Sequence, residues 1–325
     1  MFTLLFISYF LCYQGALSHV ITYHEQHHLF LFSSSYYHRT VISEGLLSYV
    51  TNFFIQFFFY PAWGSAILAF LLASVYYLTN RLIKLLCGKE DLMQLAVIPS
   101  LCLFFHTMSV DHTLQPVIAS FFLLLLLNII LSAIKRFAPC NRTIAYPQPA
   151  NKYIRIAILC VFLTGYAGYG YYHFIKSYNV SERIMLRVDK FAKAGQWDNV
   201  LEYTENYLRR GRSNQLIVYY HNLALFHTGA MPYRLLDYPQ VLGVKGLYFP
   251  WNGDSRESEY GYLLYEELGH LNEAHRWEFE AMVVWGETAP HLLNLARYNL
   301  AVHRPAVAQR FINLLKQSLF YSNEA

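Results

Sequence analysis

The stretch LQPVIASFFLLLLLNIILSAI, residues 114–134, decides the kind of fold, because it includes no charged side chain. A helix needs roughly 20 mostly apolar residues to cross a bilayer. Lys135 and Arg136 follow directly, as basic residues do at the cytoplasmic end of a membrane span. The sequence therefore predicts an all-α membrane protein.

Four other stretches have a similar apolar character. Together with the first they predict five membrane spans, at about 1–20, 62–80, 92–108, 114–134 and 154–174. The first begins at Met1 without the basic region or cleavage site of a secretory signal, so we expect a retained span.

Residues 43–60 have a different pattern, typical of an amphipathic helix lying in the membrane interface. Apolar residues share one helical face and amide or hydroxyl residues share the other, and Pro61 follows. The apolar set is Leu46, Leu47, Val50, Phe53, Phe54, Phe57 and Phe58, and the polar set is Ser48, Thr51, Asn52 and Gln56. A second interpretation is a longer span that begins near residue 46 and not near residue 62.

The charges are unevenly distributed along the chain. Hydrophobic residues make up 55% of the sequence and charged residues 14%, against about 25% charged in soluble domains. Of the 46 charged side chains, 32 lie in residues 176–325, with 16 of each sign. We therefore predict a transmembrane domain over residues 1–175 and a water-exposed domain over residues 176–325.

The basic residues before position 176 predict the orientation. Eight of the nine lie in the predicted loops after the second and fourth spans, and Arg39 is the exception. The positive-inside bias then places these loops in the cytoplasm and residues 176–325 outside. We expect a multi-pass protein of a bacterial inner membrane with a periplasmic C-terminal domain, and the lipid bilayer as its first partner.

The C-terminal domain contains a repeated turn signal. Gly195, Gly229, Gly269 and His303 each separate two helical patterns, with equal first and last intervals and a longer middle one. The equal intervals are about 34 residues, the period of tetratricopeptide repeats, each of which is a helix–turn–helix unit. The longer middle interval fits an insertion at residues 246–254, and ordinary helical hairpins with coincidental spacing are the alternative.

The predicted domain is a solenoid of about four helix pairs with a docking surface for a protein partner. We assign its repeat-turn residues a structural role: Gly195, Trp197, Gly229, Gly269 and Ala274, with Trp197 expected to be buried. Its balanced charge gives no basic stripe, so we expect no nucleic-acid partner.

One short motif could carry chemistry. His24-Glu25-Gln26-His27-His28 fits the pattern in which two His side chains on one helical face hold zinc and a Glu acts as general base. The segment has an aromatic, strand-like flank and no evident third ligand. We therefore expect a loop here, with no metal and no cofactor, and keep a zinc metalloprotease as an alternative.

A second alternative uses Glu25 by itself. Glycosyltransferases that use lipid phosphosugars resemble this layout in part, with a carboxylate in the first outer loop followed by an amphipathic helix on the membrane. Glu25 would then be an outer-face general base, and Asp111 in the next outer loop could join it.

Several stretches resemble a family of multi-span Bacteroidota membrane proteins of unknown function, DUF6057. The matching stretches are Tyr23–Gln26, Leu29–Leu31, Glu44–Leu46, Gln56–Pro61, Tyr220–Leu225, Thr228-Gly229, Glu278–Ala281 and Leu319–Tyr321. The resemblance implies a membrane domain followed by a helical exported domain, and it implies no activity and no site residues. We therefore expect a non-enzymatic scaffold or assembly factor for an envelope complex.

Overall fold

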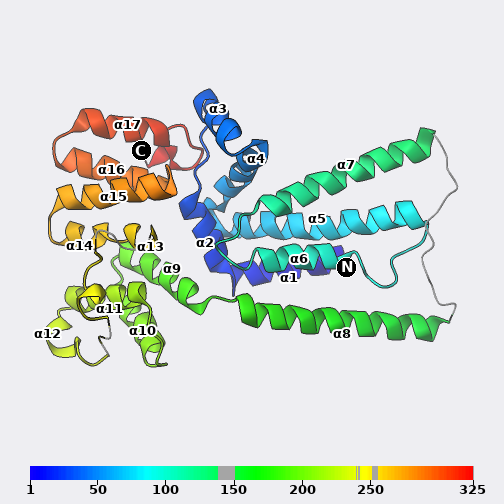
Figure 1. Ribbon diagram of the computed structural model, residues 1–325, viewed down its shortest axis with the longest axis horizontal. Coiled ribbons are helices and arrows are strands. Elements are labelled where there is room, and N and C mark those ends of the chain that lie inside the picture. The colour runs from blue at the N-terminus through cyan, green and yellow to red at the C-terminus, as the bar shows by residue number, and fades with distance from the viewer. Residues whose placement is uncertain (138–150, 239, 241, 251–254, 325) are drawn as a thin grey trace. The chain divides into compact units, whose positions relative to one another are not determined.

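In the computed structural model, which describes residues 1–137, 151–238, 240, 242–250 and 255–324, every regular element is a helix (Figure 1). This confirms the predicted all-α class. The contacts divide the chain into two units. The first comprises Met1–Ile21 and Arg39–Tyr178 and is called the membrane unit here because it contains the candidate spans. The second comprises Thr22–His38 and Asn179–Ala325 and is called the helical unit.

In the described part of the membrane unit, three helices are long and apolar enough to cross a bilayer. They are α5 (Pro61–Cys87), α7 (Gln115–Phe137) and α8 (Lys152–Ser177). The remaining helices of this unit are α1 (Phe2–Gln14), the start of α2 (Ser18–His27), the end of α3 (Ser34–Ser43), α4 (Leu46–Ile55), η1 (Gln56–Phe59) and α6 (Val97–His106). The described residues therefore contain three candidate spans, or four if the bent pair of α1 and α2 is one broken span, and not the five that were predicted.

The first predicted span, residues 1–20, is interrupted. The chain leaves the helix at Gly15, and α2 starts at Ser18 with a bend of 70° between the two helices. At 1.5 Å per residue, the 13 residues of α1 extend only about 20 Å, less than the ~30 Å of a hydrocarbon core.

The third predicted span, residues 92–108, is shortened at its start. The Asp91 carboxylate accepts a hydrogen bond from the Ala96 amide (2.8 Å), and the helix begins only at Val97. The resulting 10-residue helix α6 is too short to cross a bilayer.

The predicted amphipathic helix is present as α4 and η1, and Tyr60 has an extended backbone before α5 starts at Pro61. Its polar face is turned toward the protein, since Ser48 and Thr51 are buried while Leu46 and Phe53 are exposed.

Helices α7 and α1 also turn polar side chains toward the protein interior. Asn128 of α7 is buried and donates to the Leu78 carbonyl of α5 (3.0 Å), while Leu123, Leu126 and Ile129 are exposed. Tyr9 and Tyr13 of α1 bond to Ser100 and Thr107 in the interior. Polar groups inside and aliphatic groups outside are the arrangement expected in lipid.

The helical unit contains the helices that follow α8. They are α9 (Val180–Lys193), α10 (Trp197–Leu208), α11 (Gln215–His227), α12 (Met231–Arg234), η2 (Gly243–Gly246), α13 (Ser255–Ser258), α14 (Tyr262–Glu267), α15 (Leu271–Trp285), α16 (Ala289–Ala301), α17 (Pro305–Leu315) and η3 (Tyr321–Asn323). From α9 to α17, most helices of the helical unit contact the next long helix in the chain. The predicted insertion falls around η2 and α13, although residues 251–254 lie outside the described residues.

Four of the connections have the same backbone conformation. Gly195, Gly229, Gly269 and His303 have φ values of 68°, 67°, 74° and 58°. At each one the following amide donates to the carbonyl five residues earlier, at 2.9, 2.9, 2.8 and 2.7 Å: Gln196 to Phe191, Ala230 to Leu225, His270 to Tyr265, and Arg304 to Asn299. This is a helix C-cap closed by a left-handed residue, and it turns the chain into the next helix.

Candidate docking site

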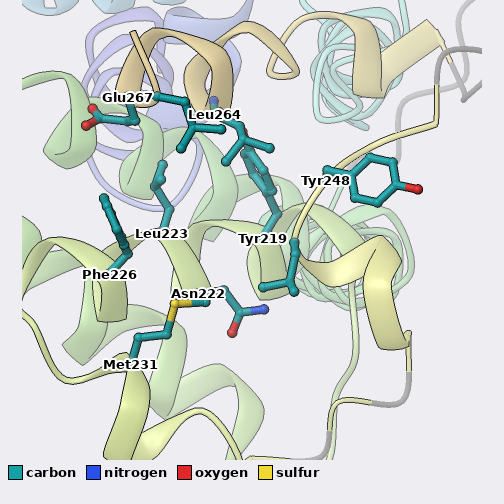
Figure 2. A pocket seen from close by; sticks show the side chains of 10 residues that line it. Tyr219, Asn222, Leu223, Phe226, Met231, Tyr248, Leu264 and Glu267 are labelled. Carbon is teal, nitrogen blue, oxygen red and sulfur yellow. Dashed lines mark hydrogen bonds between the residues drawn. The ribbon is translucent and has the colours of Figure 1, made fainter. Parts of the chain in front are cut away.

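The helical unit has an apolar pocket between α11 and α14 (Figure 2). Its volume is about 250 Å³. The apolar lining comes from both helices and from the segments that follow α11 and η2: Leu223, Phe226, Met231, Leu247, Leu264 and Leu268. Three polar side chains, Tyr219, Asn222 and Glu267, and the ring of Tyr248 complete it.

Two of the polar side chains are already used by the fold. The Tyr219 hydroxyl accepts from the Leu264 amide (3.0 Å) and donates to the Tyr260 carbonyl (3.3 Å). The Asn222 amide donates to the Gly246 carbonyl (2.8 Å) and exchanges hydrogen bonds with Gln240. These hydrogen bonds hold the pocket wall in place and occupy its polar groups, so the surface inside the pocket is apolar.

Glu267 lies at the edge of the pocket, as Figure 2 shows. Its Oε2 atom is 3.2 Å from Nε2 of His227, and the Glu267 side chain is 31% exposed. The His227 ring in turn stacks on Trp197, with 3.7 Å between ring centroids. Trp197 therefore positions His227 beside the carboxylate.

A second apolar hollow shares Phe226 and Met231 with the pocket. Its lining is completed by Gly229, Pro232, Tyr233, Leu235 and Leu236. Phe226 is 52% exposed, and Tyr233 and Leu236 are 87% and 85% exposed. Contiguous exposed apolar side chains on a unit rich in charge are typical of a protein interaction site.

Glu25, the predicted general base, belongs to the helical unit and lies outside the three candidate spans. Its Oε1 atom accepts a hydrogen bond from the Tyr321 hydroxyl. Burial raises the pKa of Glu25 to about 7, opposed by the charge of Lys193 and reinforced by that of Glu324. The carboxylate is thus held by the end of the chain.

A group of buried charges gathers around His27, two residues after Glu25. His27 Nε2 is 2.6 Å from Glu259 Oε1, and Arg256 donates to the other Glu259 oxygen (2.6 Å) and to Glu182. Burial alone would raise the pKa of Glu259, but the hydrogen bond from His27 and the positive charges around it lower it. The Arg256 guanidinium also lies 5.0 Å from the Tyr23 ring centroid. These contacts hold residues Thr22–His38 in the helical unit.

The zinc motif is helical up to His27, so the prediction of a loop was wrong. The His24 and His28 rings are 5.5 Å apart, and both His24 ring nitrogens are buried without a hydrogen-bond partner among the described residues. Burial lowers the pKa of His24. No group of three or more His, Cys, Asp or Glu side chains that could hold a metal ion occurs in the part of the chain that the structure describes.

The other predicted site residues are distributed over both units. Asp111 is exposed between α6 and α7 in the membrane unit, whereas Glu25 belongs to the helical unit. Ala274 is fully buried on α15. Trp197 is only partly buried, contrary to the prediction, because it stacks at the start of α10.

The pocket residues were not predicted. The available signal was the cluster of large apolar residues on both sides of Gly229, in the half of the chain that carries most of the charge. The contact between α11 and α14 joins helices that are well separated along the chain, and it cannot be read from that signal.

The comparisons with known proteins identify the family. DUF6057, a family of unknown function, matches residues 1–177 and 142–325, so the chain belongs to this family. No curated protein matches the chain, and no solved structure does either.

Proposed function

We propose that the chain is a membrane-anchored docking protein whose helical unit binds a protein partner, as a scaffold or assembly factor of an envelope complex. The observation that carries this proposal is the apolar pocket together with the adjoining hollow, where Phe226, Tyr233 and Leu236 are exposed. Exposing a surface of this kind to water is unfavourable, and a partner that covers it gains the free energy of its burial.

The repeated turns support the same function. Four identical C-caps at nearly regular intervals favour a tetratricopeptide-like solenoid, and solenoids present extended surfaces to partners. The pocket lies between α11, which ends just before the longest interval, and α14, which lies at the end of that interval, so the irregular part of the array would form the docking site.

The membrane unit supports an inner-membrane anchor with the helical unit in the periplasm. Figure 1 shows the C-terminal ends of α5 and α7 and the N-terminal end of α8 at one end of the membrane unit. That end carries Arg81, Lys84, Lys135, Lys152 and Arg155. The positive-inside bias makes it cytoplasmic, and the chain leaves α8 at the opposite end.

Photo-crosslinking in growing cells tests the docking function. A benzophenone amino acid at Phe226 or at Tyr233 should give one and the same protein adduct, and Met231→Asp should abolish it. Val283, 65% exposed on α15, is the control position and should give none. An adduct that forms equally at Val283, or no adduct at either pocket position, would exclude docking at this site.

A further inference from the structure

We infer that the pocket between α11 and α14 receives one large apolar side chain from a partner protein segment, and that a basic residue next to it pairs with Glu267. This inference rests on the docking function proposed above and names the chemistry of the partner.

The size of the pocket indicates a side chain. The pocket itself, at about 250 Å³, is below the roughly 300–1,000 Å³ of small-molecule sites, and the adjoining hollow of about 640 Å³ leaves room for the rest of a segment. The pocket is large enough for a single aromatic or branched aliphatic side chain. Side chains of this kind, buried in a pocket of the partner, form many interface hot spots.

The polar side chains of the pocket wall determine whether the bound side chain can be polar. Tyr219 and Asn222 are engaged by Leu264, Tyr260, Gly246 and Gln240. A polar group placed inside would lose its water without gaining a partner, which is unfavourable. The part of the ligand inside the pocket is therefore apolar.

Glu267 determines what lies beside the apolar group. Among the described residues, no hydrogen bond to its carboxylate is formed, and its ion-pair contact is with His227 and not with any Lys or Arg. Glu267 is therefore available to a Lys or Arg that the partner brings to the edge of the pocket. The adjoining hollow, which shares Phe226 and Met231, extends the surface for the rest of the segment.

Two peptides test this inference on the full chain in lipid nanodiscs. The probes are N-acetylated hexapeptides that contain Trp-Lys in one case and Trp-Glu in the other, with affinity measured by ligand-observed NMR. We expect the Trp-Lys peptide to bind about two- to fivefold more tightly, the range of a partly exposed ion pair. Glu267→Gln should remove this preference, and Phe226→Ala, at an exposed position, should weaken both peptides.

Other outcomes separate the inference from the docking function. Equal binding of both peptides to the wild type, lost in Phe226→Ala, would overturn the role of Glu267 and leave the docking site intact. A preference that survives Glu267→Gln would also overturn it. If neither peptide binds, the inference fails, whereas the docking function fails only if the crosslinked adduct is also missing.

Discussion

The carboxylate of Glu25 is held in surroundings that favour its protonated form. Its pKa rises from 4.5 to about 7 because of burial. Between these pH values the folded protein keeps a proton that the unfolded chain has lost, so the free energy of unfolding falls as the pH rises. The difference corresponds to at most about 3.5 kcal/mol, at ~1.4 kcal/mol per pH unit.

Glu25→Gln should therefore make the helical unit more stable than the wild type at pH 8 and leave it nearly unchanged at pH 4.5. The glutamine still accepts from Tyr321 but cannot ionise. Thermal unfolding followed by tryptophan fluorescence at both pH values measures this, and Glu280→Gln, at an exposed position of α15, is the control. The same pH dependence in Glu25→Gln and wild type would show that this carboxylate is not desolvated.

We expect Trp197 to contribute to the stability of the helical unit through its stacking contact with His227, because it is not a core residue. Because it is partly exposed and stacks on His227, Trp197→Ala should cost about 1–2 kcal/mol, less than the ~3–5 kcal/mol of a buried aromatic. Chemical denaturation measures the loss, and Trp197→Phe should retain most of the stability. A cost above about 3 kcal/mol would mean that Trp197 is part of the core.

The glycines of the repeated turns should be sensitive to substitution by alanine. An added Cβ at Gly195, Gly229 or Gly269 would meet no atom within 4 Å, so the left-handed backbone is the source of any penalty. Each Gly→Ala change should therefore cost about 1–2 kcal/mol. His303 already has a side chain in this conformation, and His303→Gly should cost nothing. Denaturation midpoints of the four variants check this, and harmless Gly→Ala changes would refute a common turn.

The sequence predicted the type of the elements better than their lengths. Hydropathy averaged over the length of a span indicated spans at 1–20 and 92–108, because an average does not register single residues. Gly15 ends one helix, and the Asp91 carboxylate delays the start of the other. The glycine turns were predictable because their conformation is a local property of the residue type.

At the scale of the whole molecule, the position of residues 22–38 could not be predicted. The segment follows α1 closely in sequence, and it joins the helical unit through contacts with residues far along the chain, such as His27 with Glu259 and Glu25 with Tyr321. No local pattern encodes such pairings. The pocket between α11 and α14 was missed for the same reason.

The central claim is that the membrane unit holds the helical unit on the side of the membrane opposite its basic helix ends. Fusions to alkaline phosphatase, which is active only outside the cytoplasm, test it most directly. A fusion after Ala325 should be active, and a fusion after Arg136, at the basic end of α7, should be inactive. The reverse pattern would place the helical unit and its pocket in the cytoplasm and contradict the account.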